Sequence, residues 1–147
     1  MIDIFLDITP KPQKAVQKGR MGFYDPCAAY KRTLKTLIKK ALWAYDFDPK
    51  DWPAVDVAFI FYFKKRASWT KKKKENPGPH NIRPDRDNLE KAISDAGNGI
   101  LWADDCQIVS SYSLKLWSDF NGIRIVVTPI QDISPKIGGL RPAFFCS

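Results

Sequence analysis

Hydrophobic and polar residues alternate along several segments of this chain, and the alternation predicts β-strands. Positions 2, 4, 6 and 8 are apolar and two of the three residues between them are acidic, which is the period of a strand with one buried face. Residues 55–63 are rich in β-branched and aromatic side chains and predict a second, mostly buried strand. Residues 107–117 and 123–130 predict two more strands, and the turn residues at 119–122 would join them as a hairpin.

Two further segments have the period of an α-helix. Asp25-Pro26 is a typical helix start, and apolar residues follow at helical spacing as far as Ala41. Residues 85–96 predict a second helix, with an inward-facing apolar stripe that begins at Leu89 and an end at Gly97. The order strand, helix, strand, helix, strand, strand predicts an α+β domain, with a mixed β-sheet and helices packed on one face.

Two basic stretches separate these elements. Residues 10–22 contain prolines and four basic side chains and predict an exposed basic loop. Residues 64–79 include a run of four lysines and predict a long loop, of a length that is usually functional or disordered. The formal charge of +8 attracts polyanions. On composition alone, nucleic-acid binding and a merely soluble basic domain are equally open.

Length and composition indicate one domain in the cytoplasm. A chain of 147 residues with 44% hydrophobic residues can bury one core of ordinary size. No apolar run approaches the roughly 20 residues of a membrane span, and the first eight residues carry two acids and no basic segment, unlike a secretory signal. The three cysteines are far apart and are expected to be reduced. We expect a domain over residues 1–131 and a C-terminal tail over 132–147.

The residues that indicate chemistry are acids at the start of the second predicted helix. Asp85 and Asp87 lie two positions apart, where carboxylates could hold a hard cation such as Mg²⁺. The simpler alternative is that they cap the helix and form ordinary ion pairs on its solvent face. A second acidic pair, Asp104-Asp105, precedes the strand at 107–117, and alternation along an extended backbone would turn only one of the two toward the helix.

The same segments resemble a known family. Pro84-Asp85-Arg86-Asp87-Asn88-Leu89-Glu90-Lys91-Ala92, followed by Leu101-Trp102-Ala103-Asp104-Asp105-Cys106-Gln107-Ile108-Val109, is similar to the signature of the RusA Holliday-junction resolvases of bacteria and their phages. The resemblance covers roughly residues 2–130. Arg86 departs from it, since an apolar residue is common at that position. The resemblance implies a homodimeric, Mg²⁺-dependent endonuclease, with Mn²⁺ as a substitute ion, that nicks two opposed strands of a four-way DNA junction.

Site roles follow from the resemblance position by position. Asp85, Asp87 and Asp105 would be the catalytic metal ligands, with Asp104 as a further candidate, and Lys91 would be the essential lysine. Asn88 and Asp95 would be supporting residues. The basic residues expected to contact DNA are Lys11, Lys14, Lys18, Arg20, Lys71, Lys72, Lys73, Lys74, Arg83 and Arg86.

Three residues outside the signature also carry predictions. We expect His80, in a proline-rich loop, to be a surface residue or phosphate contact rather than a base. Trp69 would anchor the basic loop to the core or stack on an unpaired base. Phe120 is a candidate for the dimer interface. Rival functions are a phage nuclease acting on flaps or forks, a DNA-binding module without activity, and a structural protein with a solvated acidic helix.

Overall fold

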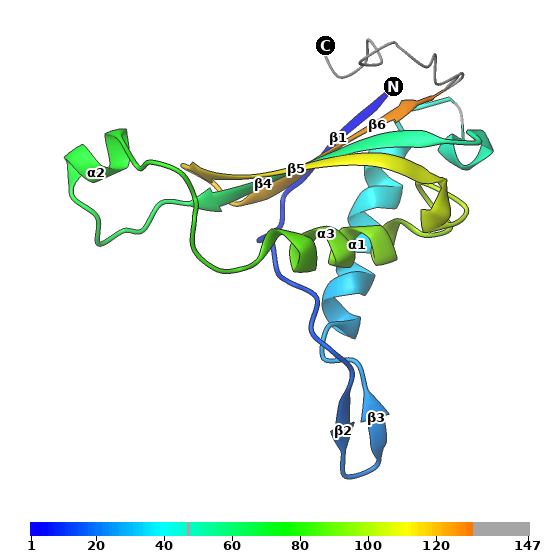
Figure 1. Ribbon diagram of the computed structural model, residues 1–147, viewed down its shortest axis with the longest axis horizontal. Helices are drawn as coiled ribbons and strands as arrows, with labels where there is room; N and C mark the ends of the chain where they lie inside the picture. The colour runs from blue at the N-terminus through cyan, green and yellow to red at the C-terminus, as the bar shows by residue number, and fades with distance from the viewer. Residues whose placement is uncertain (47, 131–147) are drawn as a thin grey trace, which may run out of the picture.

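The computed structural model describes residues 1–46 and 48–130 and contains a mixed four-stranded sheet (Figure 1). The strands are β1 (Ile2–Leu6), β4 (Val55–Lys64), β5 (Ile108–Ser118) and β6 (Gly122–Pro129), in the order β1-β6-β4-β5. β6 runs antiparallel to both β1 and β4, whereas β5 runs parallel to β4. The predicted α+β class and the mixed sheet are confirmed.

The predicted hairpin between the last two strands is wrong. β4 lies between β5 and β6, so the turn at 119–122 crosses the end of β4 instead of joining paired neighbours. The reason is burial, because Val57, Phe59 and Phe61 are fully buried and the most apolar strand takes a central position with partners on both sides. Asn121 attaches the turn between β5 and β6 to the end of β4, since its Oδ1 accepts a hydrogen bond of 2.9 Å from the backbone N–H of Lys64.

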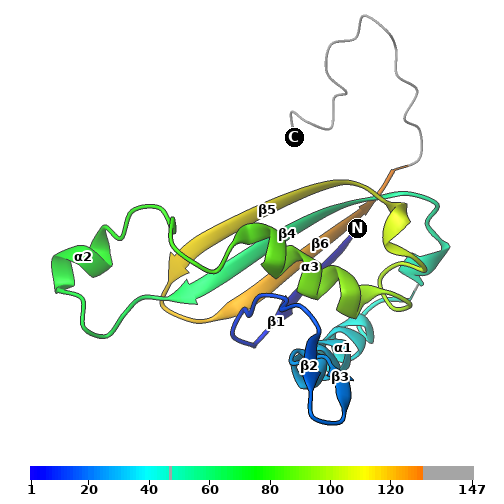
Figure 2. The same ribbon diagram turned by 60° about the horizontal axis from the view of Figure 1, so that its bottom comes forward.

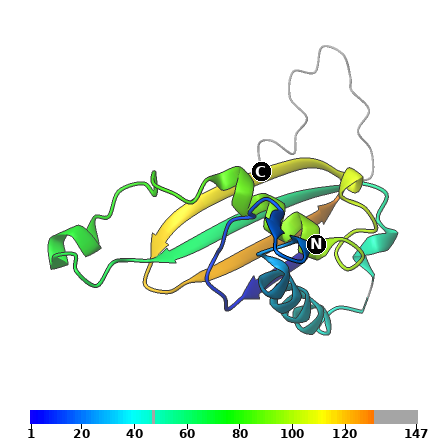
Figure 3. The same cartoon turned by 90° about the horizontal axis from the view of Figure 1, so that it is seen from below.

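Two helices, α1 (Ala28–Leu42) and α3 (Arg86–Gly97), cover one face of the sheet, as predicted (Figures 1 and 3). α1 packs against β1, α3 packs against β5, and the two helices contact each other. The predicted stripe of α3 is buried. The core between sheet and helices includes Ile4, Leu6, Leu34, Ile38, Phe59, Phe61, Leu89, Ile93, Leu101, Trp102 and Ile125.

The two basic stretches contain short elements that periodicity did not predict. A hairpin of β2 (Gln17–Gly19) and β3 (Gly22–Tyr24) projects from the domain, and a short helix, α2 (Lys71–Glu75), lies in the long excursion beyond the end of β4 (Figures 1 and 2). Thr70 caps α2 by accepting a 3.3 Å hydrogen bond from the backbone N–H of Lys73. Both elements are too short for a hydrophobic period to reveal them.

Smaller features complete the domain. Two 3-10 turns, η1 (Pro49–Asp51) and η2 (Asp105–Gln107), precede β4 and β5. Cys27 and Cys106 are free thiols. No helix within the described ranges has the length and apolar character needed to cross a membrane. Cys146 and the predicted tail over 132–147 lie outside the described residues.

Candidate active site

The first turn of α3 presents Asp85 and Asp87 to solvent. Asp85 occupies the N-cap position with an extended backbone, but its carboxylate makes no capping hydrogen bond. The helix-cap alternative therefore does not account for this side chain. Asp87 is 87% exposed and lies 3.6 Å from the guanidinium of Arg86, a pair that contributes little in water.

Lys115, on β5, fixes the segment that leads into α3. Its ammonium donates hydrogen bonds to the carbonyl oxygens of Ile82 (2.7 Å) and Pro84 (2.9 Å), directly before Asp85. Hydrogen bonds from a charged donor are stronger than neutral ones. Lys115 is therefore a positioning residue for the start of α3, and no periodicity in the sequence pointed to it.

A shallow cavity of about 350 Å³ lies beside the exposed face of α3. Asp87 and Lys91 from the helix line it together with Asp105 from η2. The structure thus brings together three of the four residues expected to be catalytic, whereas Asp85 lies outside the lining, at the start of the same helix. The other residues of this acidic cavity are Glu90, Ser94 and Asp95.

Asp104 and Asp105 have different surroundings. Asp104 caps η2, since its Oδ1 accepts a 3.2 Å hydrogen bond from the backbone N–H of Cys106, and Oε1 of Gln107 accepts one from the backbone N–H of Asp104. Asp105 is the member of the pair that lines the cavity. The two side chains differ because Asp104 is the N-cap of a 3-10 turn that begins at Asp105, in place of the expected alternation along a strand.

The ionisation of this pair is unequal. The hydrogen bond with the Asp104 carboxyl raises the pKa of Asp105, and the negative charges of Asp104 and Asp95 add to the rise. The same hydrogen bond, with that from the backbone of Cys106, lowers the pKa of Asp104. Asp105 consequently holds its proton more strongly than an isolated aspartate, and a cation in the cavity would favour its release.

Glu90 is a cavity residue that the sequence interpretation missed. Its carboxylate accepts hydrogen bonds from the hydroxyls of Ser111 (2.8 Å) and Ser113 (2.6 Å) on β5. These bonds attach α3 to the edge strand and hold one wall of the acidic cavity. The i, i+2 spacing of the two serines on one strand face was the available signal, but the strand partner of a helix residue is not readable from sequence.

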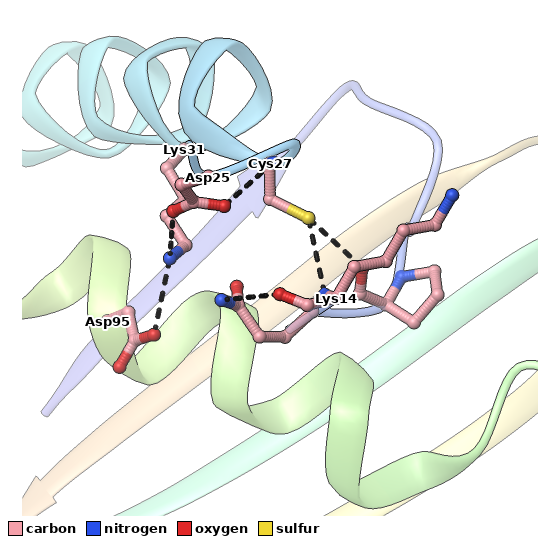
Figure 4. A network of polar contacts seen from close by, with 7 residues as sticks. Lys14, Asp25, Cys27, Lys31 and Asp95 are labelled. Atoms are coloured by element: carbon pink, nitrogen blue, oxygen red, sulfur yellow. Dashed lines mark hydrogen bonds and ion pairs between the residues drawn. The ribbon is translucent and has the colours of Figure 1, made fainter. Parts of the chain in front are cut away.

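Asp95 belongs to an ion-pair chain that reaches α1. The ammonium of Lys31 lies 2.9 Å from Asp25 and 3.5 Å from Asp95 (Figure 4). The simpler alternative of ion pairs along the solvent face of α3 therefore does not describe Asp95, whose partner comes from another helix. Within residues 1–46 and 48–130, Lys91 forms no ion pair, so its charge remains available to a ligand.

Comparison with protein families decides the identity of the domain. The family model described as Endodeoxyribonuclease RusA matches residues 6–128, which is most of the chain. The chain belongs to the RusA endodeoxyribonuclease family. A search of curated proteins found no match. Membership indicates a nuclease of the Holliday-junction class, and the acidic cavity lies within the matched range.

The RusA signature maps onto two walls of this cavity. Asp85-Arg86-Asp87-Asn88-Leu89-Glu90-Lys91 forms the N-cap and start of α3, and Asp104-Asp105 forms the N-cap and first residue of η2. Asn88 does not line the cavity, but its carbonyl oxygen accepts a 2.8 Å hydrogen bond from the backbone N–H of Gln13. Its backbone therefore ties the first basic stretch to α3.

The donor set of the cavity suits a hard cation. In the part of the chain that the structure describes, no three His, Cys, Asp or Glu side chains converge closely enough to hold a metal ion. Mg²⁺, however, commonly takes only one or two carboxylates and keeps several waters. Asp87 and Asp105 meet that requirement as oxygen donors on facing elements of one cavity.

The predicted DNA-contacting residues lie in three exposed groups around the RusA domain. Lys18 and Arg20 are on the projecting hairpin, with Lys11 and Lys14 in the segment before it. Residues 71–74 lie in α2, and Arg83 and Arg86 flank the start of α3. Lys11 lies over the ring of Tyr30, 5.6 Å from its centroid.

The predicted surface position of His80 is wrong, and one of the two predictions for Trp69 is confirmed. His80 is 7% exposed and packs between Phe63 and Trp117, at centroid distances of 4.3 and 4.2 Å. Burial lowers the pKa of His80, so at neutral pH it acts as an aromatic core residue. Trp69 meets Trp117 edge to face at 4.8 Å, which anchors the loop before α2.

Proposed function

We propose that this protein is a Mg²⁺-dependent, structure-selective endonuclease that resolves four-way DNA junctions by paired nicks in recombination and repair. The observation that carries the proposal is the acidic cavity, in which Asp87, Asp105 and Lys91 of the RusA signature meet. Four carboxylates and one ammonium line it. Such a site on a chain with a charge of +8 fits a cation bound against a DNA phosphate.

In the proposed mechanism, Asp87 and Asp105 would hold the metal ion, and Asp85, at the start of α3 and outside the cavity lining, would supply the further carboxylate that the family resemblance implies. When bound, Mg²⁺ or Mn²⁺ activates a water and stabilises charge on the phosphoryl oxygens. Lys91, which forms no ion pair among the described residues and lies on the same wall as Asp87, would stabilise the transition state or the leaving oxygen. Asp105 would bind the ion as a carboxylate, and its proton would pass to solvent. Asp104 serves the site by capping η2, and Lys115 by fixing the backbone before Asp85.

Two nicks in opposed strands require two equivalent sites, and a twofold dimer is the simplest assembly that supplies them. Phe120 and Phe5 are each about half exposed and pack with Tyr62, at ring distances of 5.7 Å (Phe5 to Phe120) and 5.2 Å (Tyr62 to Phe120). We propose this aromatic cluster, at the turn between β5 and β6, as part of the surface that meets a second copy of the chain. A mass of 16.8 kDa at sedimentation equilibrium, together with full junction-resolving activity at that concentration, would contradict the dimer.

The proposed activity is tested with a synthetic mobile four-way junction, with and without Mg²⁺. We expect paired symmetric nicks only with the ion. Asp85→Asn, Asp87→Asn and Asp105→Asn should each abolish cleavage, because each removes a carboxylate proposed to bind the metal ion. Each should spare DNA binding, because the loss of a negative charge leaves the surface at least as positive. Rates within about tenfold of the wild type for all three, about 1.4 kcal/mol in barrier, would refute the site. Flap and fork substrates in parallel separate a general branched-DNA nuclease, and metal-independent binding without cleavage identifies an inactive DNA-binding module.

A further inference from the structure

The β2–β3 hairpin exposes apolar side chains at its tip. Met21 is fully exposed and Phe23 is 77% exposed, although both belong to a hairpin that projects from the domain (Figures 1 and 2). Large apolar side chains gathered on a projection are unusual for a monomer surface and mark a contact with a partner. The domain core does not need them, since no residue of the hairpin belongs to it.

The hairpin is braced so that its tip keeps its shape. The hydroxyl of Tyr24 donates a 2.8 Å hydrogen bond to Oε1 of Gln17 across the two strands. The ring of Tyr24 also packs on Gly19, where an added Cβ would lie 3.2 Å from it. Gly22 has a φ of +118°, a conformation that L side chains rarely adopt. These contacts and the turn conformation hold together the projecting hairpin on which Met21 and Phe23 are exposed.

The charge around the tip favours a polyanion. Residues 10–24 contain four basic side chains and no acid. Lys18 and Arg20, on either side of the first strand's end, are exposed next to the apolar tip. An apolar wedge flanked by basic residues is a combination with which proteins enter DNA at unstacked base steps.

Both ends of the hairpin are tied to the wall of the acidic cavity. Asp25, directly after β3, pairs with Lys31, which also pairs with the cavity residue Asp95 (Figure 4). Before β2, the backbone N–H of Lys14 donates to Sγ of Cys27 at 3.3 Å. The backbone N–H of Gln13 donates to the backbone carbonyl of Asn88 on α3. The base of the hairpin is therefore tied to the helix that forms one wall of the cavity, which couples a DNA contact at the tip to the cleavage site.

We propose that the hairpin tip inserts Met21 and Phe23 against unstacked bases at the branch point of the DNA, while Lys18 and Arg20 hold the adjacent phosphates. This inference rests on the proposed function, because it takes branched DNA as the ligand. A branch point is where bases are least firmly stacked, so insertion there needs less energy than in continuous duplex. The hairpin would then contribute selectivity for structure, and α2 and the other basic groups would contribute general affinity.

The test compares the double variant Met21→Ser, Phe23→Ser with Trp43→Ser, which removes an 84% exposed apolar residue at the end of α1. Affinity is measured for a four-way junction and for a linear duplex of the same sequence in Ca²⁺ or EDTA, and thermal unfolding confirms that each variant is folded. We expect the double variant to lose at least about fivefold in junction affinity, the lower bound for one base stacked on an aromatic side chain. Its affinity for the duplex, and both affinities of Trp43→Ser, should not change.

A second readout follows the bases directly. With 2-aminopurine at the branch point, the wild type and Trp43→Ser should raise its fluorescence on binding, and the double variant should not. The proposal would be overturned if the double variant lost equal affinity for junction and duplex, or if its fluorescence response matched that of the wild type. So would a double variant that keeps its junction affinity but loses binding to anionic lipid vesicles or changes its sedimentation mass, because the tip would then serve a membrane or a second copy.

Cleavage by the wild type in Mg²⁺ is scored with the same junction, so that two failures can be told apart. A wild type that cleaves, with a double variant that binds and cleaves equally well, refutes the role of the hairpin alone. A wild type that neither prefers nor cleaves the junction refutes the proposed function and the hairpin's role with it. The charge variant Lys18→Gln, Arg20→Gln should weaken binding to both the junction and the duplex. The slope of log affinity against log salt concentration should become shallower by about 0.9 for each lost phosphate contact.

Discussion

The anchoring of the loop before Asp85 by Lys115 leads to a quantitative prediction for Lys115→Met. The substitution keeps most of the stem and removes both hydrogen bonds to the carbonyls of Ile82 and Pro84. The bond to Ile82 is exposed, so water can replace the lysine at that carbonyl and little free energy is lost. The bond to Pro84 is partly buried, so most of its contribution to the unfolding free energy should be lost. A hydrogen bond to a charged group contributes about 1.5–3 kcal/mol, so we expect a loss near 2 kcal/mol of unfolding free energy.

For a domain of this size, about 2 kcal/mol corresponds to a fall of roughly 4–8 °C in Tm. Release of the loop also frees the carboxylate of Asp85, so Mg²⁺-dependent cleavage, assayed well below Tm, should fall by about tenfold with junction binding retained. The matched control is Lys35→Met, which removes the same charge from the exposed face of α1. Calorimetry and single-turnover cleavage measure the two effects. A Tm for Lys115→Met within about 1 °C of the control would refute the anchoring role.

Three other predictions follow from the site and its supports. Because hydrogen bonding to Asp104 raises the pKa of Asp105, Mg²⁺-dependent cleavage should be lost on acidification at a higher pH than it would be without that hydrogen bond, and Asp104→Ala should move the loss to lower pH in a pH–rate profile. Gly97→Ala should lower the unfolding free energy in denaturant titration by about 1–3 kcal/mol, since its Cβ would lie 2.6 Å from the ring of a buried tryptophan. Lys91→Ala should impair cleavage more than binding, whereas neutralising residues 71–74 should weaken binding to any DNA and flatten its salt dependence; equal loss of binding from both changes would make Lys91 one more phosphate contact.

The local sequence was sufficient for the elements that depend on periodicity. Alternation located β1 and β6, and the apolar stripe from Leu89 located α3 with its acids on the opposite face. The signature around Asp85-Arg86-Asp87 placed the chain in the RusA family. These properties are readable because each depends on residues within one or two turns of the chain, where the hydrophobic period follows the geometry of the backbone.

The tertiary structure alone decided which elements meet. Three features join residues that are distant in sequence. They are the insertion of β4 between β5 and β6, the hydrogen bonds from Ser111 and Ser113 to Glu90, and the ion pair between Lys31 and Asp95. Each depends on which surfaces compete best for burial, a choice that the period of a single segment does not encode. For the same reason His80, polar and in a proline-rich loop, became a buried aromatic neighbour of Phe63, because the strand ends around it left apolar surface for its ring to cover.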